Sequence, residues 1–304
     1  MNKIAIISFY LEMLPRPKTS GRDRFANFKL FRKERHELIG HLLSDANKAG
    51  CTHALFPGWT FVYGENENVS QLKEDLRKIQ KLSKALEISI IGEFTILPNR
   101  KNVEFTPAPA PYGIYAFEKG KIINTEIRQQ FATSPQAGGN PKYGGRPSEA
   151  YKKVVGDIFS KKRIITIGGL NFLILVCGET NILYNSKDMK QPRFRFNLEI
   201  GLEKKLRSLP HHIVFNPGHT EFSNFTLGLF KKRWRFLSKG KPNYISRVVF
   251  CIYTTNITES NCSFDKGTYI YKNGGSQSAS ESEERKISEG NYVQAVWLGI
   301  LECA

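Results

Sequence analysis

Short apolar runs alternate with longer amphipathic segments over the first hundred residues of the chain. The apolar runs cover residues 3–9, 53–57 and 88–97, and between them apolar side chains recur at three- to four-residue spacing over residues 22–49 and 69–86. The runs are typical of buried strands, and the spacing between them is typical of amphipathic helices. The pattern predicts β-α-β-α-β, a sheet with helices packed on it through right-handed crossovers.

From residue 112 onward the pattern changes to hairpins and single strands. Residues 112–117 and 121–127 flank a Glu-Lys-Gly turn, and residues 163–177 hold two apolar runs joined by a Gly/Asn turn. Both arrangements are typical of β-hairpins. Further helices are predicted over residues 149–160, 197–209 and 221–237, and further strands over residues 212–215, 244–253, 268–271 and 292–301.

Two polar segments interrupt this second part. Residues 133–147 are rich in Gly and Pro, which predicts a loop, and residues 274–290 are rich in Ser and Glu, which predicts a mobile surface segment. The chain has no internal repeat and no linker. We therefore expect one mixed α/β domain over residues 1–304.

Composition narrows the class of protein. Hydrophobic residues make up 40% and charged residues 24% of 304, which is typical of a globular chain. The five cysteines are odd in number and none has CxxC spacing, which argues against a disulfide framework or a zinc site. The first apolar run meets Glu12 before a signal-peptide core is complete, and no run approaches the ~20 apolar residues of a membrane span. We expect a soluble, cytoplasmic protein without a metal or cofactor.

The charge is strongly positive, with 45 Lys+Arg against 28 Asp+Glu and a net charge of +17. Such an excess favours contact with nucleic acid, another anionic partner or an acidic membrane surface. The densest clusters are residues 22–35, 161–163 and 231–235, and none belongs to a recognised nucleic-acid module. The alternative for each cluster is a solvated basic face.

The strongest chemical candidate is Cys177. It ends the apolar run 172–176 and is followed by Gly178 and Glu179. A thiol at the end of a buried strand is placed like a nucleophile, and a Gly after it leaves a backbone N–H open to an oxyanion. The alternative is a structural cysteine, because free Cys is among the residue types most often buried.

Several landmarks along the chain resemble the carbon–nitrogen hydrolase (nitrilase) superfamily over nearly the whole length. They are the first strand, LFPGW at 55–59, FEKGKII at 117–123, TEIRQQF at 125–131, Cys-Gly-Glu at 177–179 and Asn-Pro-Gly-His at 216–219. The order and spacing of these landmarks carry the resemblance. It implies a four-layer αββα sandwich with mixed sheets and outer helices, which usually pairs as a homodimer. It also implies a Glu-Lys-Cys catalytic set that opens a small-molecule amide or nitrile through a cysteine thioester.

By this resemblance, Cys177 matches the nucleophile and Gly178 the oxyanion donor after it. Two positions depart from the family pattern: the general-base Glu is replaced by Gly58, and the Lys is matched most easily by Arg128. Glu149 matches a second Glu that many members carry. The alternative for Glu149 is a carboxylate that stabilises a helix N-terminus.

Glu93 is a candidate for the missing base from the residues alone. It follows Gly92 in an otherwise apolar run, where an unpaired carboxylate would be costly. It either takes the proton of Cys177, or it is structural and bonded to backbone N–H groups or a buried Arg. Arg128 is expected to hold the oxyanion or to pair with Glu93, and its high pKa excludes it as a proton donor.

Three further residues are expected to border the pocket. Trp59 follows the second strand, and Asn216 and His219 lie at the end of the strand over 212–215. Trp59 shapes an acyl site or is simply a buried aromatic. A lone His at such a place is more often a hydrogen-bonded loop residue than a catalyst.

Two functions from different classes follow. The first is a carbon–nitrogen hydrolase in which Cys177 attacks the carbonyl, Glu93 takes its proton, and Gly178 and Arg128 hold the oxyanion. The alternative is a catalytically degenerate relative that binds a ligand, a nucleic acid or a protein partner through its pocket or basic surface, favoured by Gly58, Arg128 and the +17 charge. A scaffold without pocket chemistry explains neither Cys-Gly-Glu nor a Glu within an apolar strand.

Overall fold

The structure is a computed structural model of the chain. It describes residues 2–12, 32–63, 69–96, 110–131, 149–195, 201–219, 224–239, 250–257, 268–289 and 292–303. Within these residues, none of the helices is both long and apolar enough to cross a membrane.

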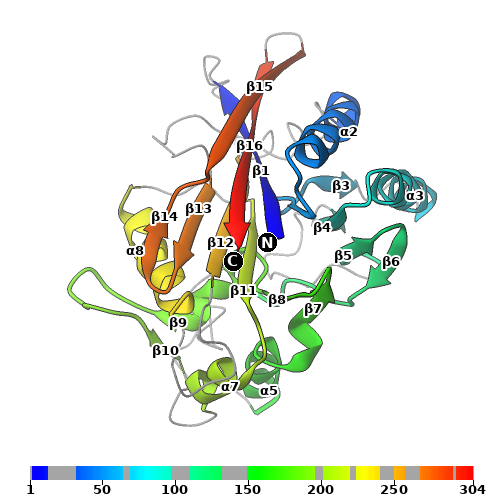
Figure 1. Cartoon of the computed structure of the whole chain (residues 1–304). Helices are drawn as coiled ribbons and strands as arrows, with labels where there is room; N and C mark the ends of the chain where they lie inside the picture. Colours follow the sequence, from blue (N-terminus) through cyan, green and yellow to red (C-terminus); the bar gives the residue numbers. More distant parts are fainter. Residues whose placement is uncertain are drawn as a thin grey trace.

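The first part of the chain forms the predicted alternation of strands and helices (Figure 1). Strand β2 pairs in parallel with both β1 and β4, as crossovers through helices require. The start of the helix predicted over residues 22–49 lies outside the described residues. The elements are β1 (Asn2–Glu12), α2 (Arg32–Lys48), β2 (His53–Leu55), β3 (Phe61–Tyr63), α3 (Val69–Ala85), β4 (Ser89–Ile96), β5 (Gly113–Glu118) and β6 (Lys121–Asn124).

The second part confirms the predicted hairpins and adds a second group of strands. Strands β5 and β6 pair antiparallel, as do β7 and β8, while β8, β11 and β12 pair in parallel. The elements are α5 (Glu149–Ile158), β7 (Ile164–Ile167), β8 (Leu170–Ile174), β9 (Leu183–Tyr184), β10 (Arg193–Phe194), α7 (Leu202–Ser208), β11 (Ile213–Gly218), α8 (Asn224–Leu237), β12 (Phe250–Ile257) and β13 (Thr268–Lys272).

Alternate side chains on the strands enter different apolar cores. On β1, Ile4 and Ile6 lie in a core shared with Phe172 and Ile174 of β8. The neighbouring β1 residues face a second core with α2 and α3, and the neighbouring β8 residues face a third core with α5, α7 and α8. Figure 1 accordingly shows α2 and α3 on one side of the strands and α8 on the other. The strand period of two therefore builds a core between strands and one under each group of helices.

The segment 274–290, which its Ser and Glu content predicts to be a mobile surface segment, instead contains strands. Strand β14 spans Gly275–Gln277, and β15 spans Glu281–Glu289 and pairs antiparallel with β16 (Tyr292–Cys303) along its whole length. Arg285 forms an ion pair with Asp45 of α2. A polar sequence can form such a strand because its backbone bonds are met by β16, while an antiparallel sheet tolerates a solvated face. The predicted loop over residues 133–147 lies outside the described residues.

Candidate active site

Cys177 lies where the apolar run of β8 ends and a short 3₁₀ helix, Cys177–Ile182, begins. Its φ of 42° is in the left-handed region, which a non-glycine residue rarely adopts. The Asn216 side chain on β11 donates to the carbonyl of Cys177 at 2.9 Å and to that of Leu175, and accepts from the Trp234 indole N–H at 3.0 Å. Asn216 is fully buried. Asn216 therefore fixes the backbone that presents the Cys177 thiol. Gly178, the next residue after Cys177, is also buried.

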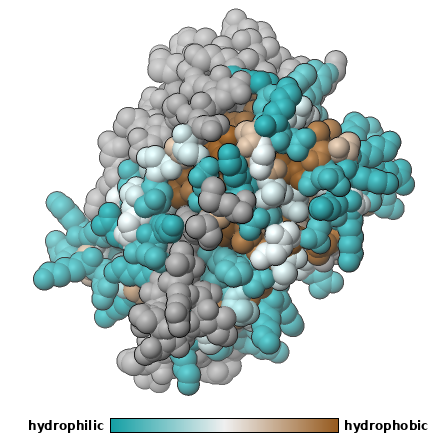
Figure 2. Space-filling model, viewed as in Figure 1, coloured by the Kyte–Doolittle hydropathy of each residue, from teal (hydrophilic) through white to brown (hydrophobic). Residues whose placement is uncertain are grey.

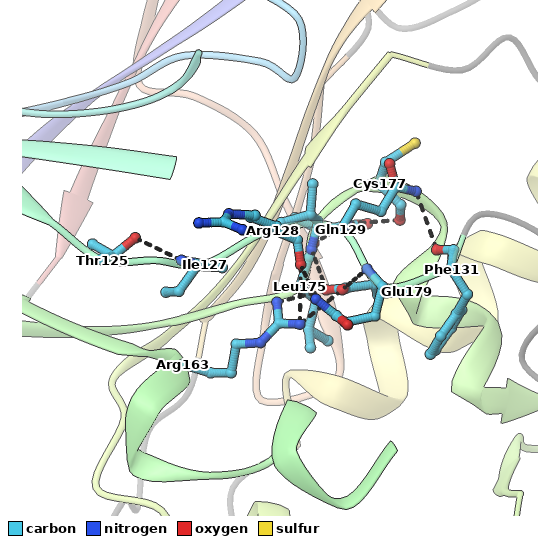
Figure 3. Close-up of polar contacts among 12 residues, drawn as sticks. Thr125, Ile127, Arg128, Gln129, Phe131, Arg163, Leu175, Cys177 and Glu179 are labelled. Atoms are coloured by element: carbon cyan, nitrogen blue, oxygen red, sulfur yellow. Dashed lines mark hydrogen bonds and ion pairs between the residues drawn. The ribbon is translucent and has the colours of Figure 1, made fainter. Parts of the chain in front are cut away.

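Glu179 is bound by a buried arginine rather than left in a pocket. Both of its oxygens accept from Arg163 at 2.9 Å, and they also accept the backbone N–H groups of Gln130 at 2.7 Å and Val176 at 2.8 Å (Figure 3). Arg163 is 6% exposed, so the alternative of a solvated basic face over residues 161–163 is wrong for Arg163. The carboxylate anchors the turn after β8 to the segment around Gln130, which is a structural role.

Glu93 is a buried carboxylate with a different set of neighbours. It lies on β4, is 4% exposed, and its Oε2 accepts the backbone N–H of Trp59 at 3.0 Å. Among the described residues it forms no ion pair. Burial raises the pKa of Glu93 from its ordinary 4.5 to about 7, the Trp59 hydrogen bond opposes that rise, and the charge of Glu179 adds to it.

The Glu93 carboxylate lies beside Gly58. A Cβ placed on Gly58 would come within 3.0 Å of Glu93 Oε2 and 3.0 Å of the Gly218 carbonyl carbon. Space for a side chain at position 58 is therefore already taken by the carboxylate from β4 and by the backbone at the end of β11. The absence of a side chain at Gly58 is what allows Glu93 to reach this place.

His219 and Trp59 form a stacked pair against the thiol. Their ring centroids lie 3.8 Å apart with planes 11° from parallel, and His219 Nε2 lies 3.8 Å from Cys177 Sγ. Burial lowers the pKa of His219 from 6.5 to about 3, so the imidazole is neutral at physiological pH. Its Nδ1 is buried and has no hydrogen-bond partner among the described residues. The structure thus brings together Cys177, His219 and Trp59, and joins Glu93 to them through the Trp59 backbone.

The direct contact between His219 and the thiol was not predicted. One signal for it is present in the sequence, because Trp59 and His219 each follow a Pro-Gly pair, at 57–58 and at 217–218. Both pairs lie at the carboxyl ends of parallel strands, where Pro-Gly ends a strand and the next side chain can turn inward. Two such repeats on one sheet edge indicate side chains that meet.

Arg128 is not brought to the thiol. In Figure 3 its guanidinium extends away from the Cys177 sulfur, and no ion pair joins it to Glu93 within the described part of the chain. Its charge instead acts on the Tyr115 phenol, where it opposes the rise in pKa that burial causes. Among the described residues Arg128 therefore forms no ion pair with Glu93, and its expected contact with an oxyanion stays a prediction.

Two further predictions concern Glu149 and metal binding. Glu149 is the first residue of α5, and its side chain lies outside the residues whose side chains the structure describes. Within the described residues, no group of three or more His, Cys, Asp or Glu side chains could hold a metal ion.

Comparison with known proteins gave similarity to solved structures alone. No family model matches the chain, and no curated protein matches it. A mutant of the Nesterenkonia AN1 amidase from the nitrilase superfamily is 14% identical with a TM-score of 0.48, over 99% of this chain and 90% of that one. The Nesterenkonia sp. AN1 amidase with acrylamide added at its active-site cysteine is 14% identical with a TM-score of 0.47, over 97% of this chain and 92% of that one.

Proposed function

We propose that this protein is a carbon–nitrogen hydrolase that opens small amides or nitriles through a thioester on Cys177. The observation that carries the proposal is the position of Glu93. Its carboxylate occupies the space beside Gly58, the position that holds the general-base Glu in the superfamily pattern. A carboxyl group whose pKa is raised to about 7 suits proton transfer near neutral pH.

The roles divide among groups that differ in chemistry. The thiol of Cys177 is the nucleophile, and the backbone N–H of Gly178 is the oxyanion donor. Glu93 carries the proton of the water that hydrolyses the thioester. Arg128 keeps no part in this proposal as an oxyanion partner, because its guanidinium is directed away from the sulfur (Figure 3).

We extend the proposal to the layer order of the fold. Support comes from the three apolar cores, of which one lies between strands of both halves and the other two lie under helices. Such a sequence of layers corresponds to an αββα sandwich. Cys177, Trp59 and His219 then lie at strand ends, which is where αβ folds place reactive groups.

Release of ammonia from a panel of simple aliphatic and aromatic amides tests the function. Wild type is expected to release ammonia, and Cys177→Ala is expected to lose that activity with its fold intact. Cys51→Ala is the matched control, because Cys51 and Cys177 are both 4% exposed and only the second faces His219. Turnover that survives Cys177→Ala would remove the assignment.

One surface favours the second candidate function, which is binding of an anionic partner. On the β9–β10 pair, the exposed ring of Tyr184 lies under the guanidinium groups of Arg193 at 5.3 Å and Arg195 at 5.2 Å. Lys232 of α8 donates to the carbonyls of Lys187 and Met189 at 2.9 Å. These bonds attach residues 183–195, here called the β9–β10 arm, to a basic helix. Figure 2 shows hydrophilic side chains gathered at the arm.

Retention on heparin tests that surface. Arg193→Ala with Arg195→Ala should lower the salt concentration of elution, because fewer counterions are released on binding. Lys73→Ala with Lys81→Ala on α3 removes the same charge from another exposed face and is the control. Equal losses in both double variants would mean that the arm contributes only net charge.

A further inference from the structure

The proton of the Cys177 thiol has a direct acceptor in the structure. Sγ lies 3.8 Å from His219 Nε2, which is within the reach of a hydrogen bond to sulfur. Glu93, by contrast, has its printed hydrogen bond to the backbone N–H of Trp59. The two acid–base groups of the site therefore differ in what they touch: the imidazole touches the reacting atom, and the carboxylate touches the backbone beside it.

We propose that His219 is a catalytic residue that accepts the Cys177 proton as the thiol attacks; this inference rests on the proposed function. Neutral His219 can accept at Nε2 only when its hydrogen is on Nδ1, and that nitrogen is buried without a partner in the described residues. That tautomer places a lone pair on Nε2 beside the sulfur. Because burial lowers the pKa of the imidazole to about 3, the proton can pass to it only as sulfur bonds to the carbonyl carbon and the S–H becomes strongly acidic. The task of removing the thiol proton thus belongs to His219, and Glu93 acts on water.

Trp59 supports this role by holding the ring. The indole and imidazole planes are 11° from parallel with centroids 3.8 Å apart, so the ring can rotate little without breaking the stack. When the imidazole gains the proton, its positive charge lies over an indole face, which attracts cations. The stack therefore orients Nε2 toward the sulfur and stabilises the imidazolium that proton transfer creates. Glu93 in turn holds Trp59, because its carboxylate accepts the backbone N–H of Trp59. Trp59 has a φ of 60°, in the left-handed region.

The proposed sequence of steps balances without an outside reagent. The thiol proton passes to His219 Nε2 while sulfur bonds to the carbonyl carbon and the C=O electron pair moves to oxygen. The tetrahedral intermediate collapses, the C–N bond breaks, and the leaving amine takes the proton from the imidazolium. Water then adds to the thioester and gives its proton to Glu93. The C–S bond breaks and releases the product acid. The Cys177 thiolate then recovers a proton from the protonated side chain of Glu93.

Alkylation by iodoacetamide tests the inference without requiring a known substrate. Rates at Cys177, Cys51 and Cys303 are measured by peptide mass spectrometry between pH 6 and 9, in H₂O and D₂O, for wild type, His219→Gln and His219→Ala. All three thiols are 4–5% exposed, so Cys51 and Cys303 report loosening of the fold in each variant. Gln keeps most of the volume of the imidazole but is a far weaker base, whereas Ala also opens space.

A loss of tenfold or more at Cys177 alone in His219→Gln, with loss of the solvent isotope effect, is the expected result. General-base assistance is worth about 10²–10⁴-fold in rate, so tenfold is a conservative threshold. A smaller change, or one shared by Cys51 and Cys303, would overturn the inference and leave His219 as a packing residue. Alkylation does not depend on amide turnover. A chain that alkylates as expected but releases no ammonia would lose the proposed function, whereas ammonia release with unchanged alkylation would remove only His219.

Discussion

Two buried carboxylates lie near the candidate nucleophile, and their surroundings are opposite. Glu179 is fully buried, is bound through both oxygens by Arg163, and accepts two backbone N–H groups. Glu93 is 4% exposed, accepts one backbone N–H, and forms no ion pair among the described residues. Carboxylates that look alike in the sequence thus have contrasting environments about one nucleophile.

The contrast teaches how to separate a structural acid from a reactive one. A carboxylate with four strong donors gains stability from the surrounding network. A carboxylate with one donor in an apolar site favours its protonated form, and the pKa of Glu93 is accordingly raised to about 7. Glu179 therefore holds the turn, and Glu93 is the carboxyl group that we propose for proton transfer.

The largest effect should come from breaking the Glu179 pair. Glu179→Gln leaves the Arg163 guanidinium buried without its counter-charge, and we expect the free energy of unfolding to fall by about 3–5 kcal/mol. Urea unfolding followed by circular dichroism measures it. Glu74→Gln is the control, because its pair with Lys78 is exposed on α3 and should be worth less than about 1 kcal/mol. Equal, small losses in both variants would contradict the structural role of Glu179.

Glu93 should give the next largest effect, and that effect depends on pH. Its folded pKa of about 7 exceeds its ordinary value of 4.5, so between these values the folded state binds a proton that the unfolded state releases. Stability therefore falls as pH rises through this window, by about 1.4 kcal/mol per unit and roughly 3 kcal/mol in all. Glu93→Gln should remove that slope.

Urea unfolding of wild type and Glu93→Gln at pH 5 and pH 8 measures the difference. The variant should gain about 2–3 kcal/mol relative to wild type between the two values. Stability curves that stay parallel across this range would show that Glu93 is already ionised in the folded protein.

A smaller effect is expected at Gly58, where the carboxylate and a backbone meet. Gly58→Ala places a Cβ within 3.0 Å of Glu93 Oε2 and of the Gly218 backbone, and such overpacking costs about 1–3 kcal/mol. Gly40→Ala on α2 has no atom within 4 Å of the new Cβ and should stabilise the helix by about 0.5–1 kcal/mol. Thermal unfolding of both variants gives the comparison. A Gly58→Ala variant as stable as wild type would mean that the carboxylate can leave this place freely.

Much of the fold could be predicted because strands and helices leave strong periodic signals. The alternation of β1, α2, β2, α3 and β4 follows from the spacing of apolar residues, and the two hairpins follow from Gly-containing turns. Strand β15 could not be predicted in this way. No local apolar pattern marks it, and its Arg285 contacts Asp45 of α2, which lies 240 residues earlier in the chain.

The candidate site could be predicted in its members but not in its contacts. Cys177, Glu93, Trp59 and His219 each follow or interrupt an apolar strand, which is a local signal. The partner of each side chain depends on strand order and on small rotations, which is why Arg128 was expected at the oxyanion and Arg163 on a solvated face. Arg163 in fact lies buried on Glu179, because the turn after β8 brings the carboxylate to it.

The relative reactivity of Cys177 shows whether it differs chemically from Cys51 and Cys303, the other two thiols that the structure describes as buried. Cys51, Cys177 and Cys303 are 4%, 4% and 5% exposed, so accessibility alone does not distinguish them. Burial raises the pKa of Cys303 to about 11 and slows that thiol further, so Cys51 is the stricter reference. Iodoacetamide labelling of the native protein at pH 7, followed by peptide mass spectrometry, gives the three rates side by side. We expect Cys177 to react at least tenfold faster than either of the others, because an adjacent base assists its attack. A Cys177 that reacts no faster than Cys51 would mean that its neighbours do not activate the thiol.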